Sequence, residues 1–145
     1  MAFLEHTEFF DRLNRLAVKI DAKKESLGPD GLSREENVLD RIWTAVAVLE
    51  NGSFQYFSEC GLNAGVVALA YKEIGMETVA TLFGKADRIL GPIADKPWDI
   101  RLKLLAEHEA DLDALAAEVL KHTLEGEAKL VEYINEHPQQ FSPNP

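Results

Sequence analysis

Apolar residues recur at helical spacing along almost the whole chain, and this periodicity restricts the possible folds more than any other feature. Phe9, Leu13, Leu16 and Ile20 recur at i, i+4, i+7 and i+11, which predicts one apolar helical face. No strand-like alternation of apolar and polar residues continues for more than four residues. The sequence therefore predicts an all-α protein in which residues 1–145 form a single compact helical domain of five to seven helices.

Turn and capping residues divide the apolar pattern into separate helices. Residues 33–36, with serine first and glutamate last, predict a capping box at the start of the second helix. Asn63 is predicted to be the N-cap of the third helix. We expect Asn51-Gly52 to end the second helix and Gly91-Pro92 to end the fourth, while Gly84 predicts close packing inside the fourth.

The C-terminal part of the chain also has a helical pattern. It resumes at Trp98 and continues to about Glu136, with an interruption expected near Ala110–Asp113 or at Gly126. Three prolines follow, so residues 138–145 cannot continue the helix, and we expect them to form a partly mobile tail.

The acidic residues are distributed unevenly. The formal net charge is −10; residues 1–103 contain 16 acidic and 13 basic side chains, and residues 104–145 contain nine acidic and two basic ones. The second segment therefore has a net charge of −7, as two minus nine. Because direct binding to nucleic acid requires clustered Lys and Arg, a nucleic-acid partner is not predicted.

Part of this acidic segment is predicted to form one surface. Glu118, Glu125 and Glu132 have heptad spacing, which places them near one side of a helix. The spacing predicts a partner-binding acidic face made of Glu107, Asp111, Glu118, Glu125, Glu132 and Glu136.

The charge density of this face is lower than that of DNA. As one helix, residues 107–136 would span about 45 Å, or roughly one net charge per 6 Å. Duplex DNA carries about one charge per 1.7 Å. A homodimer, or Glu5, Glu8 and Asp11 placed alongside, would reduce the difference.

Several chemical functions have no sequence signature in this chain. It contains no glycine-rich phosphate loop and no Gly-x-Ser-x-Gly elbow, and its histidines never have the i, i+4 spacing of a zinc site. We therefore predict no catalytic residue, metal ligand or cofactor. Without an apolar run of about 18–20 residues or a basic signal sequence, a cytoplasmic location is expected. The single cysteine, Cys60, is predicted to be a buried, inert thiol.

The most distinctive local sequence is NGSFQYF at residues 51–57, followed by a glycine at position 61. Three aromatic residues within four positions predict an apolar plug between the second and third helices, with the two glycine-containing segments reversing the chain. We interpret the motif as a corner of the core and not as a ligand site. Its residues are Asn51, Gly52, Phe54, Gln55, Tyr56, Phe57 and Gly61.

This motif resembles that of a bacterial DNA-mimic-protein domain family, much of which is catalogued as a domain of unknown function. The resemblance covers about residues 38–137, and it also includes Ala68, Leu69, Ile74-Gly75, Ala86, Tyr133-Ile134, His137-Pro138 and Phe141. The chain departs from the family pattern at Ser53, where a second glycine is usual, and at Glu59-Cys60, where Asn-Ser is more typical.

The resemblance implies a small acidic protein that occupies the DNA-binding surface of a transcription regulator. On this basis we expect a non-enzymatic protein that binds a basic partner. A first alternative is a protein–protein interaction scaffold that uses its second to fourth helices and whose acidity only aids solubility. A second alternative is a small-molecule enzyme with a pocket that has no recognisable sequence motif.

Overall fold

The computed structural model describes residues 8–141, and helices account for most of them. They are α1 (Glu8–Leu27), the short 3-10 helix η1 (Pro29–Gly31), α2 (Arg34–Glu59), α3 (Ala64–Glu73), α4 (Glu77–Ala94), α5 (Trp98–Glu107), α6 (Glu109–Leu120) and α7 (Thr123–Glu136). No strand occurs within the described range. The all-α prediction is confirmed, and the seven α-helices are the upper limit of the predicted number.

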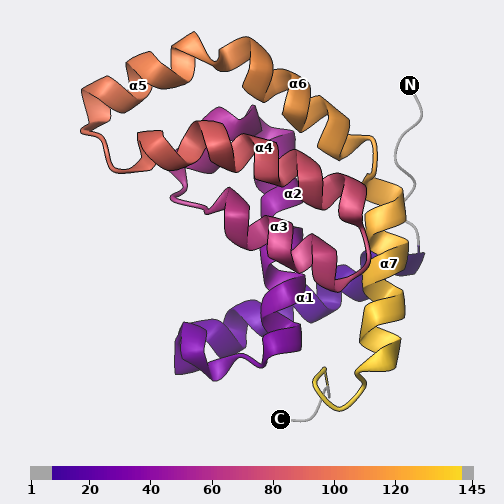
Figure 1. Cartoon of the computed structure of the whole chain (residues 1–145). Coiled ribbons are helices and arrows are strands. Elements are labelled where there is room, and N and C mark those ends of the chain that lie inside the picture. The colour runs from indigo at the N-terminus through magenta and orange to yellow at the C-terminus, as the bar shows by residue number, and fades with distance from the viewer. Residues whose placement is uncertain (1–7, 142–145) are drawn as a thin grey trace.

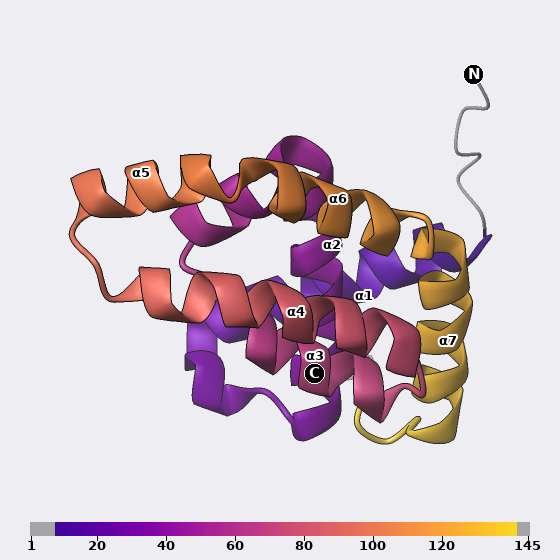
Figure 2. The ribbon, with the colours of Figure 1, turned by 45° about the horizontal axis from the view of Figure 1, so that its top comes forward.

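The helices pack around α2, which runs through the middle of the molecule (Figure 1). Helices α3 and α4 pack against each other, and α6 packs on both α2 and α4. Helices α5 and α6 follow one another along α4, whereas α7 runs at a steep angle to α6, as both views show (Figures 1 and 2). Helix α7 packs mainly on α1, so the C-terminal helices cover two different parts of the core.

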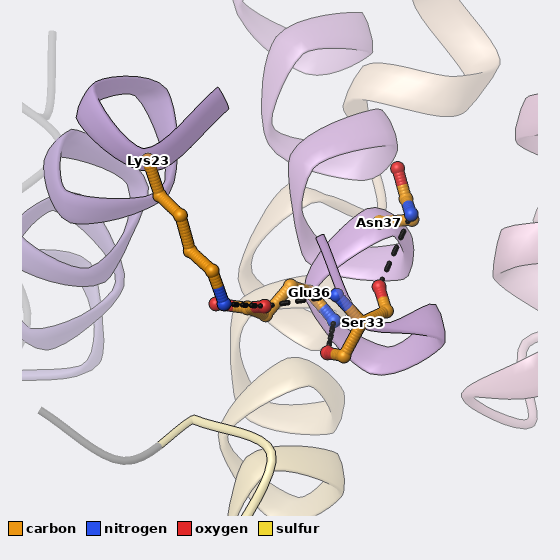
Figure 3. Close-up of polar contacts among 4 residues, drawn as sticks. All are labelled: Lys23, Ser33, Glu36 and Asn37. Carbon is orange, nitrogen blue, oxygen red and sulfur yellow. Dashed lines mark hydrogen bonds and ion pairs between the residues drawn. The ribbon is translucent and has the colours of Figure 1, made fainter. Parts of the chain in front are cut away.

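The start of α2 is tied to α1 by a buried glutamate (Figure 3). The Oγ atom of Ser33 accepts a 3.0 Å hydrogen bond from the backbone amide of Glu36. The Glu36 carboxylate accepts one of 2.9 Å from the Ser33 amide and one of 2.7 Å from Nζ of Lys23 on α1. The predicted capping box is therefore confirmed, and Lys23 extends it to the neighbouring helix. Asn63 likewise caps α3 as predicted, because its side chain accepts from the amide of Val66.

The predicted apolar residues of α1 all lie on this one helix, and the buried part of their face begins at Leu13. Leu13 and Ile20 are buried, together with Ala17, and Leu16 is partly buried against the core. Phe9, at the N-terminal end of this face, is 42% exposed.

The second helix bends at Asn51-Gly52 instead of ending there. Gly52 has φ −170° and ψ 25°, and Ser53 has φ 60° and ψ −162°, after which the helix resumes and continues to Glu59. A Cβ atom at position 52 would lie 2.5 Å from Cβ of Tyr56, which explains the glycine. The next change of direction occurs at Gly61, whose φ of 71° agrees with its predicted role in a turn.

The bend directs the rings of Phe54 and Phe57 into the core. Both are fully buried, and their centroids lie 5.7 and 6.1 Å from that of Phe83 on α4. The ring of Tyr71 on α3 stacks on Phe83 at 5.4 Å. The predicted core corner is therefore present, but Tyr56 is not part of it, since its side chain is 41% exposed.

Gln55 and Cys60 have environments that the sequence did not indicate. Both polar atoms of the Gln55 side chain are buried without a hydrogen-bond partner among the described residues. Cys60 is exposed, which contradicts the predicted buried thiol. It follows the last residue of α2, where the chain leaves the core.

Helix α4 continues through Gly91-Pro92 to Ala94, so the predicted end at this pair is wrong. Ile93 is only 3% exposed, and its burial favours one more helical turn although proline lacks an amide hydrogen. The prediction of close packing at Gly84 is also wrong, because a Cβ atom there would have no neighbouring atom within 4 Å.

We expect Ser53→Gly to be more stable than Ser53→Ala by about 1–3 kcal/mol, the cost of a backbone geometry that only glycine adopts readily. Both variants lose the 2.7 Å hydrogen bond from Ser53 Oγ to Asp113 Oδ1, so the comparison isolates the backbone effect. Urea unfolding followed by circular dichroism measures the difference. Equal free energies of unfolding would show that the serine is not strained.

Gly84→Ala should increase the free energy of unfolding by about 0.5–1 kcal/mol, because alanine favours a helix interior and the added methyl group meets open space. Gly75→Ala is the matched control: with φ at 83° it should destabilise the protein. Thermal and urea unfolding of both variants would test this contrast. A loss of stability in Gly84→Ala would contradict the open environment.

Candidate functional site

The acidic segment forms three helices and not one. The helical path is interrupted at His108, with φ −104° and ψ 8°, and at His122, with φ −99° and ψ 12°. At the second interruption the hydroxyl of Thr123 donates a 2.8 Å hydrogen bond to the carbonyl of Leu120. The interruption expected near Ala110–Asp113 occurs two residues earlier, at His108, whereas the alternative position, Gly126, is helical.

The six acids of the predicted face are all exposed, but they belong to different helices. Glu107 ends α5, Asp111 and Glu118 lie on α6, and Glu125, Glu132 and Glu136 lie on α7. Because α7 turns away from α6, Glu118 does not continue the row formed by the acids of α7 (Figures 1 and 2). The heptad spacing survives within each helix, between Asp111 and Glu118 and between Glu125 and Glu132.

Three of these six acids contact a basic side chain three residues away. Glu118 pairs with Lys121 at 2.6 Å and Glu132 with Lys129 at 3.7 Å, and Nδ1 of His122 lies 3.4 Å from Oε2 of Glu125. The hydrogen bond and the positive charge of Lys121 lower the pKa of Glu118. Exposed pairs of this kind are weak and are screened by salt, so they can be exchanged for pairs with a partner.

The N-terminal acids proposed to join the face are only partly described. Glu5 lies outside the described residues, as does the side chain of Glu8. Asp11 is exposed on α1, the helix on which α7 packs. Of the predicted tail, residues 142–145 lie outside the described range, and Phe141 before them is 6% exposed.

A cavity of about 270 Å³ lies between α1, α2, α3 and α7, beside the acidic helices. The rings of Phe10, Trp43 and Tyr71 line it, and the centroids of Phe10 and Trp43 are 5.3 Å apart. Glu50 on α2 and Glu127 on α7 also line it. Its described lining contains no histidine, cysteine or serine, so any acid–base chemistry there would depend on these two carboxylates.

The cavity changes the ionisation of two of its residues. Glu50 is an exposed residue, but partial burial of its carboxyl group raises its pKa, and the negative charge of Glu127 raises it further. Burial also raises the pKa of the Tyr71 phenol above its ordinary value, so Tyr71 remains a neutral hydroxyl at physiological pH. The site therefore combines two carboxylates, aromatic walls and the hydroxyl groups of Tyr71 and Thr123.

The sequence contains no motif that predicts this cavity. Of its lining residues, Gly126 was expected to interrupt a helix, and Trp43 lies on α2. Trp43 and Glu50 are seven residues apart, which places both on one side of α2. Gly126 is buried in α7, where a Cβ atom would lie 3.9 Å from Sδ of Met76.

A second hollow, of about 520 Å³, lies between α2 and α3 and has the opposite charge. Arg34, Arg41 and Lys72 line it, and Arg34 forms a 2.7 Å ion pair with Glu73. Leu69, which also lines it, is 64% exposed. This is the surface on which the scaffold hypothesis depends.

Residues 8–141 provide neither a metal site nor a membrane-spanning helix. No group of three or more His, Cys, Asp or Glu side chains there could hold a metal ion. None of the described helices combines the length and the apolar character needed to cross a bilayer.

We expect Glu50→Gln to raise the melting temperature at pH 7. The folded state raises the pKa of Glu50, so the stability associated with this group is greatest below its ordinary value of 4.5 and decreases as pH rises through the folded value. The difference between variant and parent should therefore shrink as the pH is lowered towards 4. Glu107→Gln, which removes a carboxylate that does not line the cavity, is the control that should change little. A lower melting temperature for Glu50→Gln at pH 7 would contradict the sign of the effect.

Comparison with known proteins identified one family. The family model described as DMP19-like protein matches residues 30–137. The match ends at the same residue as the predicted resemblance and begins earlier, so that it includes the capping box of α2. No curated protein and no solved structure matched the chain.

Proposed function

The chain belongs to the family of DMP19-like proteins, and from this premise we propose that it is a non-enzymatic DNA mimic. Its acidic C-terminal helices occupy the DNA-binding surface of a basic protein, such as a transcription regulator. The observation that carries this proposal is that all six acids of the predicted partner-binding face are exposed. They lie on α5, α6 and α7, within a segment whose net charge is −7.

Helix α6 is the element best suited to imitate a DNA strand. It contains four acids and no lysine or arginine, namely Glu109, Asp111, Asp113 and Glu118. Its 12 residues span about 18 Å, or roughly one acid per 4.5 Å. One strand of a duplex carries about one phosphate per 3.4 Å, so the density of α6 approaches that of a single strand.

The acids of α6 imitate only one strand of a duplex, so a mimic of the whole duplex needs a second row of acidic side chains. Helix α7 does not provide it in line with α6, because the two helices meet at a steep angle (Figure 2). A homodimer would supply a second copy of α6, and we include this dimer and a cytoplasmic location in the proposal. Because α6 and α7 run in different directions, we expect the partner to contact the exposed surfaces of both helices where they meet.

Charge reversal tests the proposal directly. The triple variant Glu118→Lys, Glu125→Lys and Glu132→Lys should lose the basic partner in pull-downs from the native host. Capture by the parent protein should fall steeply between about 50 and 200 mM salt, as counterion-dependent binding does. The matched control reverses three exposed acids elsewhere, Asp21, Glu25 and Asp30, and should retain the partner.

The scaffold alternative predicts the opposite pattern. Leu69 is exposed beside the hollow between α2 and α3, so Leu69→Ser should then release the partner while the triple reversal has no effect. Capture that is insensitive to salt, or full capture by the triple reversal, would reject the DNA-mimic proposal in favour of this alternative.

A further inference from the structure

The cavity between α1, α2, α3 and α7 has the size of a site for one side chain. Its volume of about 270 Å³ is slightly below the range of roughly 300–1,000 Å³ that is usual for small-molecule sites. Thr123, Gly126 and Glu127 on its wall belong to α7, which also carries the exposed acids Glu125 and Glu132. A protein docked on α7 therefore lies next to this cavity.

The walls of the cavity offer three kinds of contact to a cation. The faces of Trp43 and Phe10 attract positive charge through their ring quadrupoles. The carboxylates of Glu50 and Glu127 add two negative groups. Tyr71, only 3% exposed, adds a phenol hydroxyl to the lining.

Of the natural side chains, arginine matches this combination best. Its planar guanidinium stacks on aromatic rings and forms paired hydrogen bonds with a carboxylate, whereas the ammonium of lysine is a compact, strongly hydrated point charge. The remaining N–H groups of a guanidinium can reach a phenol oxygen such as that of Tyr71.

We propose that this cavity binds the side chain of an arginine presented by the basic protein partner, with Glu50 as the main acceptor. The inference rests on the proposed function for the origin of the arginine, since DNA-binding surfaces are rich in this residue. It adds a specific anchor to an otherwise diffuse attraction between charged surfaces.

Although Glu50 is exposed, its surroundings in the free protein disfavour the ionised carboxylate, and a bound arginine would favour it. Burial and the charge of Glu127 both act against ionised Glu50, and a bound guanidinium neutralises that charge. Glu50→Gln should therefore stabilise the free protein and weaken arginine binding. These opposite signs distinguish a binding role from a structural one, in which both properties would fall together.

The test uses the full chain and a blocked pentapeptide with one central arginine between alanines. Trp98 is replaced by phenylalanine, so that Trp43 is the single remaining tryptophan and reports on the cavity by fluorescence. Titration should give a saturable change, and Glu50→Gln should weaken it about tenfold or more, as expected for the loss of a charge-assisted hydrogen bond. Glu107→Gln, the control outside the cavity lining, should stay within about twofold because charges away from the bound cation are screened.

A second peptide with citrulline in place of arginine has nearly the same shape but no charge, and it should give no saturable change. Absence of saturation with the arginine peptide, an equal response to the citrulline peptide, or unchanged affinity in Glu50→Gln would each overturn the proposal. Glu127→Gln provides a second variant if Glu50→Gln fails to fold. Since no partner protein is present, this result is independent of the charge-reversal experiment, and either idea can fail alone.

Discussion

The contact of Phe54 and Phe57 with Phe83 depends on the bend in α2, and much of the remaining structure depends on that contact. A straight helix of 26 residues would extend for about 39 Å and carry its last turn away from the core. The bend at Gly52-Ser53 returns this turn to α4, where the rings pack against each other. Glu50, which lines the cavity, lies just before the bend, and Ser53 within it is bonded to Asp113 on α6. Both candidate surfaces are therefore positioned by the same local geometry.

Local signals predicted the fold class and the helix starts, but not the places where tertiary packing outweighs local preference. The capping box at 33–36 and the N-cap Asn63 form within a few residues, so the sequence contains all that they need. The end of α4 is not determined locally in this way, because the burial of Ile93 outweighs the stop signal of Gly91-Pro92. The same holds for the bend at Asn51-Gly52, where the stop signal is real but Phe54 and Phe57 bring the helix back to the core.

For the candidate surfaces too, local sequence determines some features and tertiary packing determines the others. That the six acids are exposed follows from their spacing among apolar residues, but their grouping into two directions depends on the interruption at Lys121–His122. That interruption lets α6 pack on α2 and α4 while α7 packs on α1. A short stretch of sequence does not specify which helices these two will pack against. The cavity was beyond prediction for a stronger reason. Phe10, Trp43, Tyr71 and Glu127 come from four helices that only the completed fold brings together.

Ser53 has a consequence for how this chain and its relatives can vary. Its backbone has the geometry of glycine, and its hydroxyl is bonded to Asp113. Substitutions at positions 53 and 113 are therefore coupled: a relative with glycine at position 53 has no hydroxyl for the acid to accept from, and position 113 becomes free to change. In this chain the carboxylate of Asp113 on α6 accepts a hydrogen bond from the bend. This acid therefore has a structural role in addition to its contribution to the surface charge. An alignment of relatives should show this pair changing together.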